Sequence, residues 1–226
     1  MNAVAIIPAR GGSKRIPRKN VRDFNGRPMI AWAIGHALEA RIFDRVIVST
    51  DDDEIATAAE AAGAEVPFRR PANLADDTTA TAPVIAHAIT QLGLTIDDSS
   101  PVCCIYPATP LLEANDLRRV LAAWHERPER FALTGYAPAL PITRAFTLDD
   151  EGAAKFLLPE FAQTRTQDLP LALLDVGWCY IGSTRAWSEA TSVINGASVI
   201  EIPTERAIDI DTEDDWQYAL NLVPRQ

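Results

Sequence analysis

Short apolar runs rich in β-branched residues alternate with helical patterns along the chain, and this alternation restricts the possible folds most strongly. The runs are bounded by turn-forming residues, as buried strands are, and they lie at 4–9, 45–50, 102–108 and 197–203. Apolar side chains recurring every three or four positions predict helices over 28–41, 52–62, 80–92, 113–126, 184–191 and 213–223. Strands alternating with helices predict an α/β fold: a Rossmann-like, mostly parallel sheet with helices on both faces.

The whole chain, 1–226, is expected to form a single domain with one insertion. Residues from about 137 to about 178 interrupt the alternation, and they contain four prolines and two short extended runs on either side of Gly152. We interpret this segment as an arm that contains a β-hairpin. An isolated hairpin has little core of its own, so the arm is expected to pack against a second subunit in a homodimer.

Basic residues are concentrated near the start of an acidic chain. Seven basic residues and one acidic residue fall within 10–27, whereas the whole chain has a net charge of −10. A small cationic region on an acidic protein favours a small polyanionic ligand over nucleic acid, which usually meets a broad basic face. No secretory pattern opens the chain and no apolar run approaches the roughly 20 residues of a membrane span, so we expect a cytoplasmic protein without a membrane partner.

The first predicted strand runs into the segment IIPARGGSKRIPRKN (6–20), in which two adjacent glycines lie among five cations. Ligands of open α/β sheets bind beyond the carboxyl ends of the strands, where this loop is expected. Glycines allow backbone N–H groups to approach phosphate oxygens, and Arg and Lys side chains can neutralise a triphosphate. Neither GxGxxG nor GxxxxGK[ST] is present. The loop predicts a phosphate site, and a solvated basic turn is the alternative.

Two aspartates near the C-terminus, in AIDIDTEDDW (207–216), suggest a metal site. Strand alternation would place Asp209 and Asp211 on the same face. Neighbouring carboxylates repel each other unless a cation lies between them, and Mg²⁺ commonly binds through one or two carboxylates together with substrate phosphates. The alternative is that Asp211 or Thr212 only caps the following helix, but capping would not account for Asp209.

A third acidic run, STDDDE (49–54), follows the second predicted strand. Ser, Thr and Asp are favoured at helix N-caps, and acidic side chains in the first turn are stabilised by the helix dipole. We therefore interpret this run as the start of a helix, and a role for Asp51 near the nucleotide stays open.

The segment 6–20 closely resembles the opening motif of the CMP-sialic acid synthetase family of cytidylyltransferases. The resemblance continues in order through VSTDDDEIA (48–56), RRPANLADDTT (69–79), YPATPL (106–111), TRTQDLP (164–170) and DIDTEDDW (209–216). The stretch TRTQDLPLALLDVGWCYIG is most similar to the pseudaminic acid branch of the family, although its WCYIG departs from the QFYWG usual there. Tyr106 and the Asp175–Gly177 stretch depart from the sialic acid pattern and weaken a neuraminate assignment.

The resemblance implies a role for each matching residue and a fold of the nucleotide-diphospho-sugar transferase type. Nucleotide contacts are implied for Ala9, Arg10, Gly11, Gly12, Ser13, Lys14, Lys19, Asn20, Arg70 and Thr81. Lys19 would face the reacting α-phosphate, and Lys19, Arg10, Asp209 and Asp211 would be the catalytic residues, with the two aspartates holding Mg²⁺. Contacts to the sugar are implied for Tyr106, Arg165, Gln167, Asp175 and Gly177, and Arg165 would reach the sugar from the arm of the partner subunit.

The implied reaction transfers CMP from CTP to a nine-carbon 2-keto sugar acid, with pseudaminic acid as the first choice, and releases pyrophosphate. The CMP-sugar would serve surface glycan or flagellin glycosylation. The anomeric hydroxyl of the sugar acid would attack the α-phosphate of CTP. An oxygen held by Mg²⁺, or one of the two aspartates, would accept the proton of that hydroxyl. CMP-neuraminate, CMP-legionaminate and CMP-KDO synthetases are the alternatives within the family. A non-catalytic nucleotide sensor is the alternative of another class. An aspartyl phosphatase would need a DxD motif after the first strand, where PARGG stands.

Overall fold

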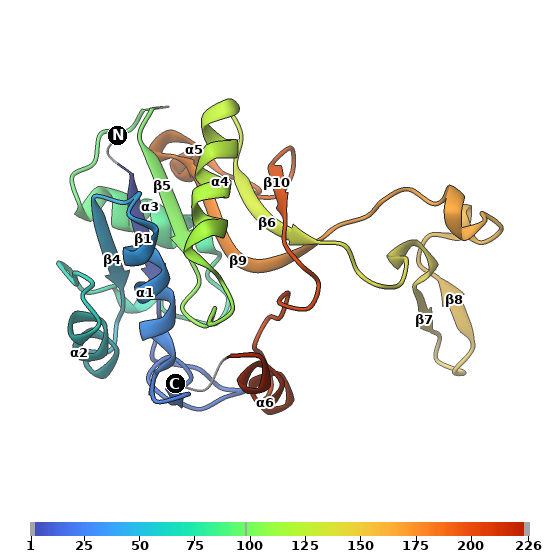
Figure 1. Cartoon of the computed structure of the whole chain (residues 1–226), viewed down its shortest axis with the longest axis horizontal. Helices are drawn as coiled ribbons and strands as arrows, with labels where there is room; N and C mark the ends of the chain where they lie inside the picture. Colours follow the sequence, from blue (N-terminus) through green and yellow to red (C-terminus); the bar gives the residue numbers. More distant parts are fainter. Residues whose placement is uncertain (1–2, 98, 224–226) are drawn as a thin grey trace.

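The computed structural model describes residues 3–97 and 99–223, and its central element is a six-stranded sheet in the order β10-β6-β9-β5-β1-β4 (Figure 1). The strands are β1 (Val4–Pro8), β4 (Arg45–Ser49), β5 (Pro101–Ile105), β6 (Ala132–Tyr136), β9 (Leu174–Ser183) and β10 (Ser198–Glu201). β1 pairs in parallel with β4 and β5, and β10 with β6, whereas β9 runs antiparallel to both of its neighbours. The predicted mostly parallel sheet is confirmed.

Helices cover both faces of the sheet. They are α1 (Met29–Ala40), α2 (Asp53–Ala61), α3 (Thr81–Gln91), α4 (Ala114–Glu126), α5 (Thr184–Glu189) and α6 (Glu213–Leu222). Along β1, Ala5 and Ile7 belong to the core with α1, α2 and α4, whereas Val4 and Ile6 face the core with α3 and α5. This alternation buries both faces of β1, as a central parallel strand requires. In the described parts of the chain, no helix is long and apolar enough to cross a membrane.

The chain region that leads from β1 to α1 contains a small hairpin, β2 (Asp23–Phe24) with β3 (Arg27–Pro28). Its two turn residues, Asn25 and Gly26, have φ values of 53° and 88°, as a type I′ turn requires. The buried ring of Phe24 lies edge-on to Trp216 of α6, with 5.1 Å between ring centroids. This contact holds the C-terminal helix beside the loop that follows β1.

The predicted elements appear with boundary shifts of a few residues, but sequence periodicity missed β6 and β9. β9 also corrects the predicted extent of the arm, because residues 174–178 lie in the sheet. Its buried stretch from Trp178 to Ser183 is enclosed between β5 and β6, so the polar–apolar alternation of a one-sided strand is absent. The arm that leaves the sheet therefore spans 137–173.

The arm extends away from the sheet and contains the expected hairpin around Gly152, β7 (Phe146–Leu148) with β8 (Ala154–Phe156) (Figure 1). All six of these strand residues are exposed in the single chain. Large apolar side chains are among the exposed residues of the arm: Leu140, Phe146, Leu148, Phe156, Leu157 and Leu171. The arm therefore presents an apolar surface without a core beneath it.

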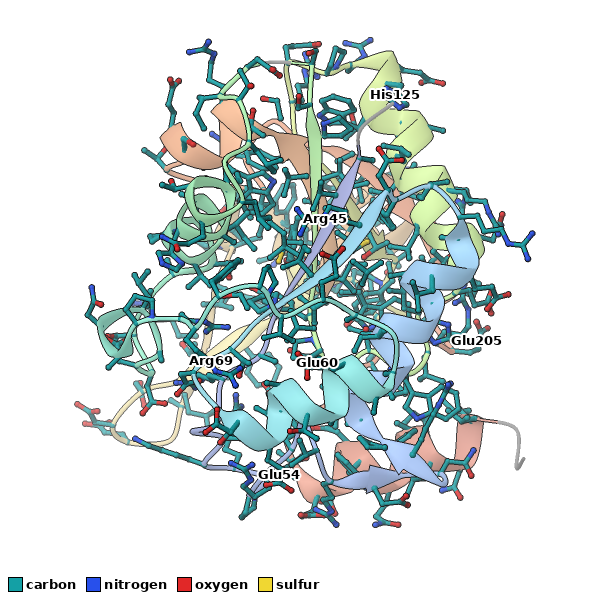
Figure 2. All side chains as sticks on the ribbon, turned by 90° about the vertical axis from the view of Figure 1, so that its left-hand side faces the viewer. Arg45, Glu54, Glu60, Arg69, His125 and Glu205 are labelled. Atoms are coloured by element: carbon teal, nitrogen blue, oxygen red, sulfur yellow. The ribbon has the colours of Figure 1, made fainter. Side chains whose placement is uncertain are left out.

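The opposite end of the molecule is a charged surface around α2 and the edge strand β4. Figure 2 shows this side, where Glu54, Glu60 and Arg69 point toward solvent. Arg45 of β4 pairs with Glu65, its Nη2 lying 2.6 Å from the Glu65 Oε2. Charged side chains at the edge of a sheet disfavour pairing with another chain, so this edge differs in character from the arm.

Candidate active site

A cavity of about 670 Å³ opens beyond the carboxyl ends of β1 and β5, between Pro8 and Tyr106. It lies where ligands of open α/β sheets bind. Many residues predicted for the site line this cavity: Arg10, Ser13, Lys14, Lys19, Asn20, Arg70, Thr81, Tyr106, Gly177, Asp209 and Asp211. Loops from distant parts of the chain therefore meet at one pocket.

The side chains of Arg10 and Lys14 converge at the pocket on one carboxylate, that of Asp77. Arg10 Nη1 lies 2.5 Å from Asp77 Oδ1 and donates to the backbone carbonyl of Asp76 at 2.8 Å. Lys14 pairs with the other oxygen of Asp77. Hydrogen bonds from Lys14 and Arg10 hold the pKa of Asp77 below its ordinary value. An anion thus already occupies the position between these two cations.

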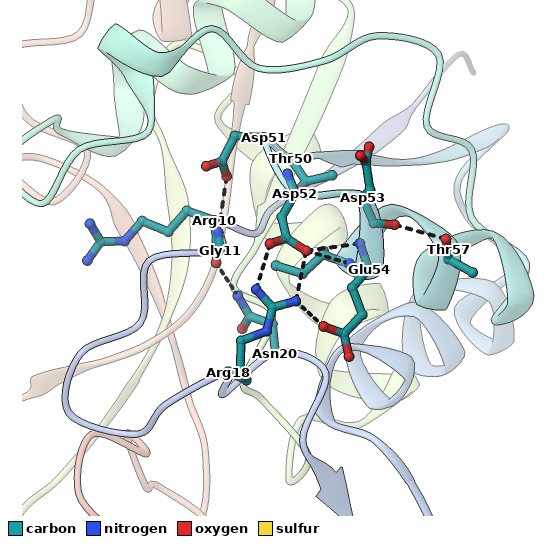
Figure 3. A network of polar contacts seen from close by, with 11 residues as sticks. Arg10, Gly11, Arg18, Asn20, Thr50, Asp51, Asp52, Asp53, Glu54 and Thr57 are labelled. Carbon is teal, nitrogen blue, oxygen red and sulfur yellow. Dashed lines mark hydrogen bonds and ion pairs between the residues drawn. The ribbon is translucent and has the colours of Figure 1, made fainter.

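The glycine loop is tied to the start of α2, as Figure 3 shows. The Gly11 N–H donates to Asp51 Oδ1 at 3.1 Å, so this amide is engaged by protein rather than open to phosphate. A Cβ on Gly11 would lie 2.6 Å from Asp52 Oδ2, which explains the need for glycine. Gly12 has open space at that position. Ala9 is buried, and its N–H donates to Ser49 O at 3.0 Å.

Lys19 joins the glycine loop to the aspartate segment. Its Nζ donates to the backbone carbonyl of Ile210 at 2.6 Å and lies 3.6 Å from Asp211 Oδ1. Arg15 pairs with the other Asp211 oxygen at 2.8 Å. The glycine loop and the carboxylate pair are therefore parts of the same site.

The segment that contains the two aspartates is not a strand, contrary to our prediction. Both side chains nevertheless line the pocket. Thr212 is the N-cap of α6, with its Oγ1 accepting from the Asp215 N–H at 3.2 Å. Thr212 therefore provides the cap, as the alternative allowed, but capping does not explain why the Asp211 carboxylate lines the pocket.

The electrostatics of the aspartate pair fit a divalent cation. The pKa of Asp209 is raised, first because surrounding protein displaces water from the carboxylate and second because Asp211 is close. Mutual repulsion of this kind is relieved when a cation lies between the carboxylates. Among the described residues, no group of three or more His, Cys, Asp or Glu side chains forms a metal site. Two carboxylates alone suit Mg²⁺ if substrate phosphates supply further oxygens.

Gly177 forms the wall of the pocket next to Asp209. Its φ of 69° lies in the left-handed region, which favours glycine. A Cβ at this position would lie 3.7 Å from Asp209 Oδ2. The backbone conformation, rather than a steric clash, therefore accounts for glycine here.

Two buried polar side chains, Asn20 and Arg70, form the inner wall of the pocket. The Asn20 amide donates to Arg10 O at 3.1 Å, but its buried Oδ1 has no partner among the described residues (Figure 3). Arg70 donates to Ser49 Oγ at 3.2 Å, and burial lowers its pKa to about 10. Buried polar atoms are nearly always hydrogen-bonded, so the free oxygen of Asn20 marks a position for a ligand donor.

The structure joins Thr81 and Tyr106, which we had assigned to different substrates. Their hydroxyls share a hydrogen bond at the start of α3, and burial raises the pKa of Tyr106 to about 12. The Tyr106 ring lies edge-on to Tyr180, whose hydroxyl donates to Asp175 Oδ2 at 2.5 Å. Asp175 is not among the residues that line the pocket of its own chain, and its contact to the sugar stays a prediction.

Arg165 and Gln167 do not line the pocket of their own chain. Both lie in the arm, where Arg165 Nε donates to Asp168 Oδ2 at 2.6 Å. The arm projects away from the sheet (Figure 1). Their assignment to the sugar stays a prediction that depends on a second subunit.

Three of the seven clustered cations have structural partners outside the pocket. Arg22 lies over Trp216 at 4.6 Å from the ring centroid, and Arg27 lies over Trp32 at 3.6 Å. Arg18 pairs with Asp52. Sequence reasoning also missed Asp77, although two adjacent acids in RRPANLADDTT were a signal that this loop could meet the cationic one.

Basic side chains and a carboxylate pair line the same pocket, and the protein is an enzyme of the nucleotidyltransferase class. A protein-family model described as cytidylyltransferase matches residues 4–150. With a full-length relative at 38% identity as well, the chain belongs to the cytidylyltransferase family.

Three comparisons show which proteins the chain is similar to. It is 38% identical to the pseudaminic acid cytidylyltransferase of Campylobacter jejuni, over 97% of this chain and 95% of the relative. It is 29% identical to the CMP-N,N'-diacetyllegionaminic acid synthase of Legionella pneumophila, over 99% of this chain and 97% of the relative. A solved structure of CMP:2-keto-3-deoxy-manno-octonic acid synthetase complexed with CTP superposes with a TM-score of 0.72 at 20% identity, covering 98% of both chains. This last likeness concerns the fold alone.

Proposed function

We propose that the enzyme transfers CMP from CTP to the anomeric hydroxyl of pseudaminic acid, a nine-carbon 2-keto sugar acid, and releases pyrophosphate. The observation that supports this most is the meeting of the cationic loop and the aspartate pair in one pocket, joined by Lys19. The choice of sugar rests on the relative with 38% identity, whose name specifies pseudaminic acid.

The residues of the pocket would act by binding and orientation. Arg10, Ser13 and Lys14 would bind the triphosphate, which takes over the position that Asp77 occupies between Arg10 and Lys14. The free Oδ1 of Asn20 would accept a hydrogen bond from the nucleotide. Lys19 would place positive charge at the α-phosphate, where charge develops during the transfer.

Asp209 and Asp211 would hold Mg²⁺ together with the phosphates of CTP. When bound, the ion supplies positive charge to the reacting and leaving phosphates. Arg15 and Lys19 pair with Asp211 on its loop side, so they would keep that carboxylate oriented toward the phosphates.

The arm supports a homodimer with shared sites. Its apolar side chains are exposed in one chain, and exposed apolar surface of this kind suits contact with a second copy. Arg165 and Gln167 would then reach the sugar in the pocket of the partner subunit. A twofold dimer gives both pockets the same arrangement.

The experiment that tests this proposal is pyrophosphate release from CTP with Mg²⁺ and one sugar acid at a time: pseudaminic, legionaminic, neuraminic or deoxyoctulosonic acid. The expected result is the highest kcat/KM with pseudaminic acid. A higher value for another sugar acid would retain the reaction and reassign the substrate. CTP binding without pyrophosphate release for all four sugar acids would favour a nucleotide sensor and contradict the proposal.

A further inference from the structure

The segment that carries Asp209 and Asp211 leaves the sheet before it reaches the pocket. Among the described residues, its last backbone hydrogen bond to a strand of the sheet joins the Ile202 N–H to Gly135 O at 2.9 Å. Beyond this point the chain turns on itself, with the Arg206 N–H donating to Pro203 O at 3.0 Å. Because no strand ladder supports the aspartates, side chains from elsewhere must set their positions.

Arg206 fastens this segment to the start of α4. Its Nη1 donates to Asp116 Oδ2 at 2.8 Å and to Leu111 O at 2.9 Å, and its Nη2 lies 3.2 Å from Asp116 Oδ1. The Asp116 side chain is only 2% exposed, and it also accepts from the Glu113 N–H at 3.1 Å. A two-pronged contact to a buried carboxylate defines the direction of the guanidinium as well as its position.

Two further contacts continue the support up to the aspartates. Trp178 Nε1 donates to Ile208 O at 3.0 Å, and Lys19 Nζ donates to Ile210 O at 2.6 Å. The Arg206 guanidinium lies 6.0 Å from the centroid of the Trp178 ring. The residue before each aspartate is therefore held by a side chain, and Arg206 anchors the turn from which the segment starts.

We propose that Arg206 is a positioning residue for the metal carboxylates, acting through its paired contact with the buried Asp116. The proposal rests on the proposed Mg²⁺ role of Asp209 and Asp211. Arg206 does not line the pocket, so its effect on the ion is indirect. Residues that hydrogen-bond a metal ligand directly typically change metal affinity by about 10- to 100-fold when substituted, and we expect Arg206 to reach the lower end of that range.

The test uses the full-length enzyme with CTP and follows Mn²⁺ binding by electron paramagnetic resonance. Arg206→Lys should still fold, because it retains a positive charge next to the buried Asp116 carboxylate. It loses the planar fork that makes the paired contact. Because removal of one partner of a buried ion pair destabilises a protein, the second variant is the double substitution Arg206→Met with Asp116→Asn, which leaves neither charge unpaired. Circular dichroism and the Tm establish that each variant is folded.

Arg119→Met is the matched control. Arg119 lies 3.7 Å from the same Asp116 carboxylate but donates to Glu201 O in β10, before the segment leaves the sheet. We expect Mn²⁺ affinity to fall about tenfold or more in Arg206→Lys and in the double variant. In Arg119→Met it should stay within about twofold of the wild type, because this side chain supports β10 and not the aspartates.

Wild-type Mn²⁺ affinity in both folded Arg206 variants would overturn the proposal, as would an equal loss in Arg119→Met. Asp209→Asn and Asp211→Asn, measured alongside, distinguish failure of the positioning role of Arg206 from failure of the Mg²⁺ role of the aspartates. If they lose Mn²⁺ affinity while the Arg206 variants do not, only the positioning role fails. If the aspartate variants also keep their affinity, the metal assignment under the proposed function fails, and the role of Arg206 fails with it.

Discussion

Arg18 and Asp52 form a two-pronged ion pair, with Nη1 to Oδ2 at 2.6 Å and Nη2 to Oδ1 at 2.9 Å (Figure 3). The pair fastens the end of the glycine loop to the start of α2, where Asp52 is also the N-cap. Arg18 has a φ of 55°, a left-handed conformation that non-glycine residues seldom adopt. The position of Arg18 in the sequence suggested phosphate binding, but its side chain instead stabilises the shape of the glycine loop.

This ion pair predicts a pH-dependent part of the stability. The pKa of Asp52 is lowered to about 2, chiefly by the hydrogen bond from Arg18. Because the pKa of Asp52 is lower in the folded protein, the ion pair adds to the free energy of unfolding at neutral pH. This contribution is lost as the pH falls from about 4 to about 2. Asp52→Asn should lower the free energy of unfolding at pH 7 by about 1 kcal/mol, since solvent screens surface pairs.

Urea unfolding at several pH values measures this effect. The difference between wild type and Asp52→Asn should shrink as the pH approaches 3. Glu54→Gln is the control: Glu54 also contacts Arg18, but its side chain is 67% exposed, so its removal should matter less. A difference that stays constant with pH would contradict the assignment of the stability to this ion pair.

Asp209→Asn and Asp211→Asn should each lower kcat by more than roughly 100-fold, the scale of one electrostatic contact in a transition state. Each substitution removes a charge from the proposed metal site with little change of shape. Steady-state pyrophosphate release measures kcat, and circular dichroism checks the fold. Near-normal kcat in both variants would exclude the aspartates from the metal role.

Lys19→Ala and Arg10→Ala should affect different kinetic constants. Lys19 contacts Asp211 and the Ile210 carbonyl, so its loss should lower kcat more than it raises the KM for CTP. Arg10 should act mainly in CTP binding, and its loss should raise the KM by about tenfold or more, as expected for a hydrogen bond to a charged group. Initial rates over a CTP series separate the constants. A defect in KM alone for Lys19→Ala would contradict its place at the α-phosphate.

Subunit mixing tests whether the arm contributes to the partner's pocket. An inactive Asp211→Asn chain and an inactive Arg165→Ala chain should together recover activity, because one of the two pockets in each mixed dimer receives both wild-type residues. Exchange is verified by pulldown with different tags on the two chains, and recovered pyrophosphate release is the readout. No recovery despite verified exchange would mean that Arg165 acts within its own chain or has no role in catalysis.

Much of the fold followed from local sequence patterns. Six predicted helices and four predicted strands are present because each depends on periodicity within a short segment. The glycine-rich cationic loop and the aspartate pair were likewise recognisable, since their chemistry is contained within a few neighbouring residues. Local pattern could not identify β9, because Gly177 and Gly182 interrupt its apolar run. Its antiparallel direction depends on how the arm returns to the sheet.

The sequence by itself determined which groups are available for chemistry, whereas the tertiary structure decided which of them meet. Of the clustered cations, Arg10 and Lys14 share Asp77, while Arg18 pairs with Asp52. Arg206 meets Asp116 across 90 positions of sequence. Pairing over such a separation depends on how the helices pack on the sheet, and a free energy shared among many distant contacts leaves no periodic trace in the sequence.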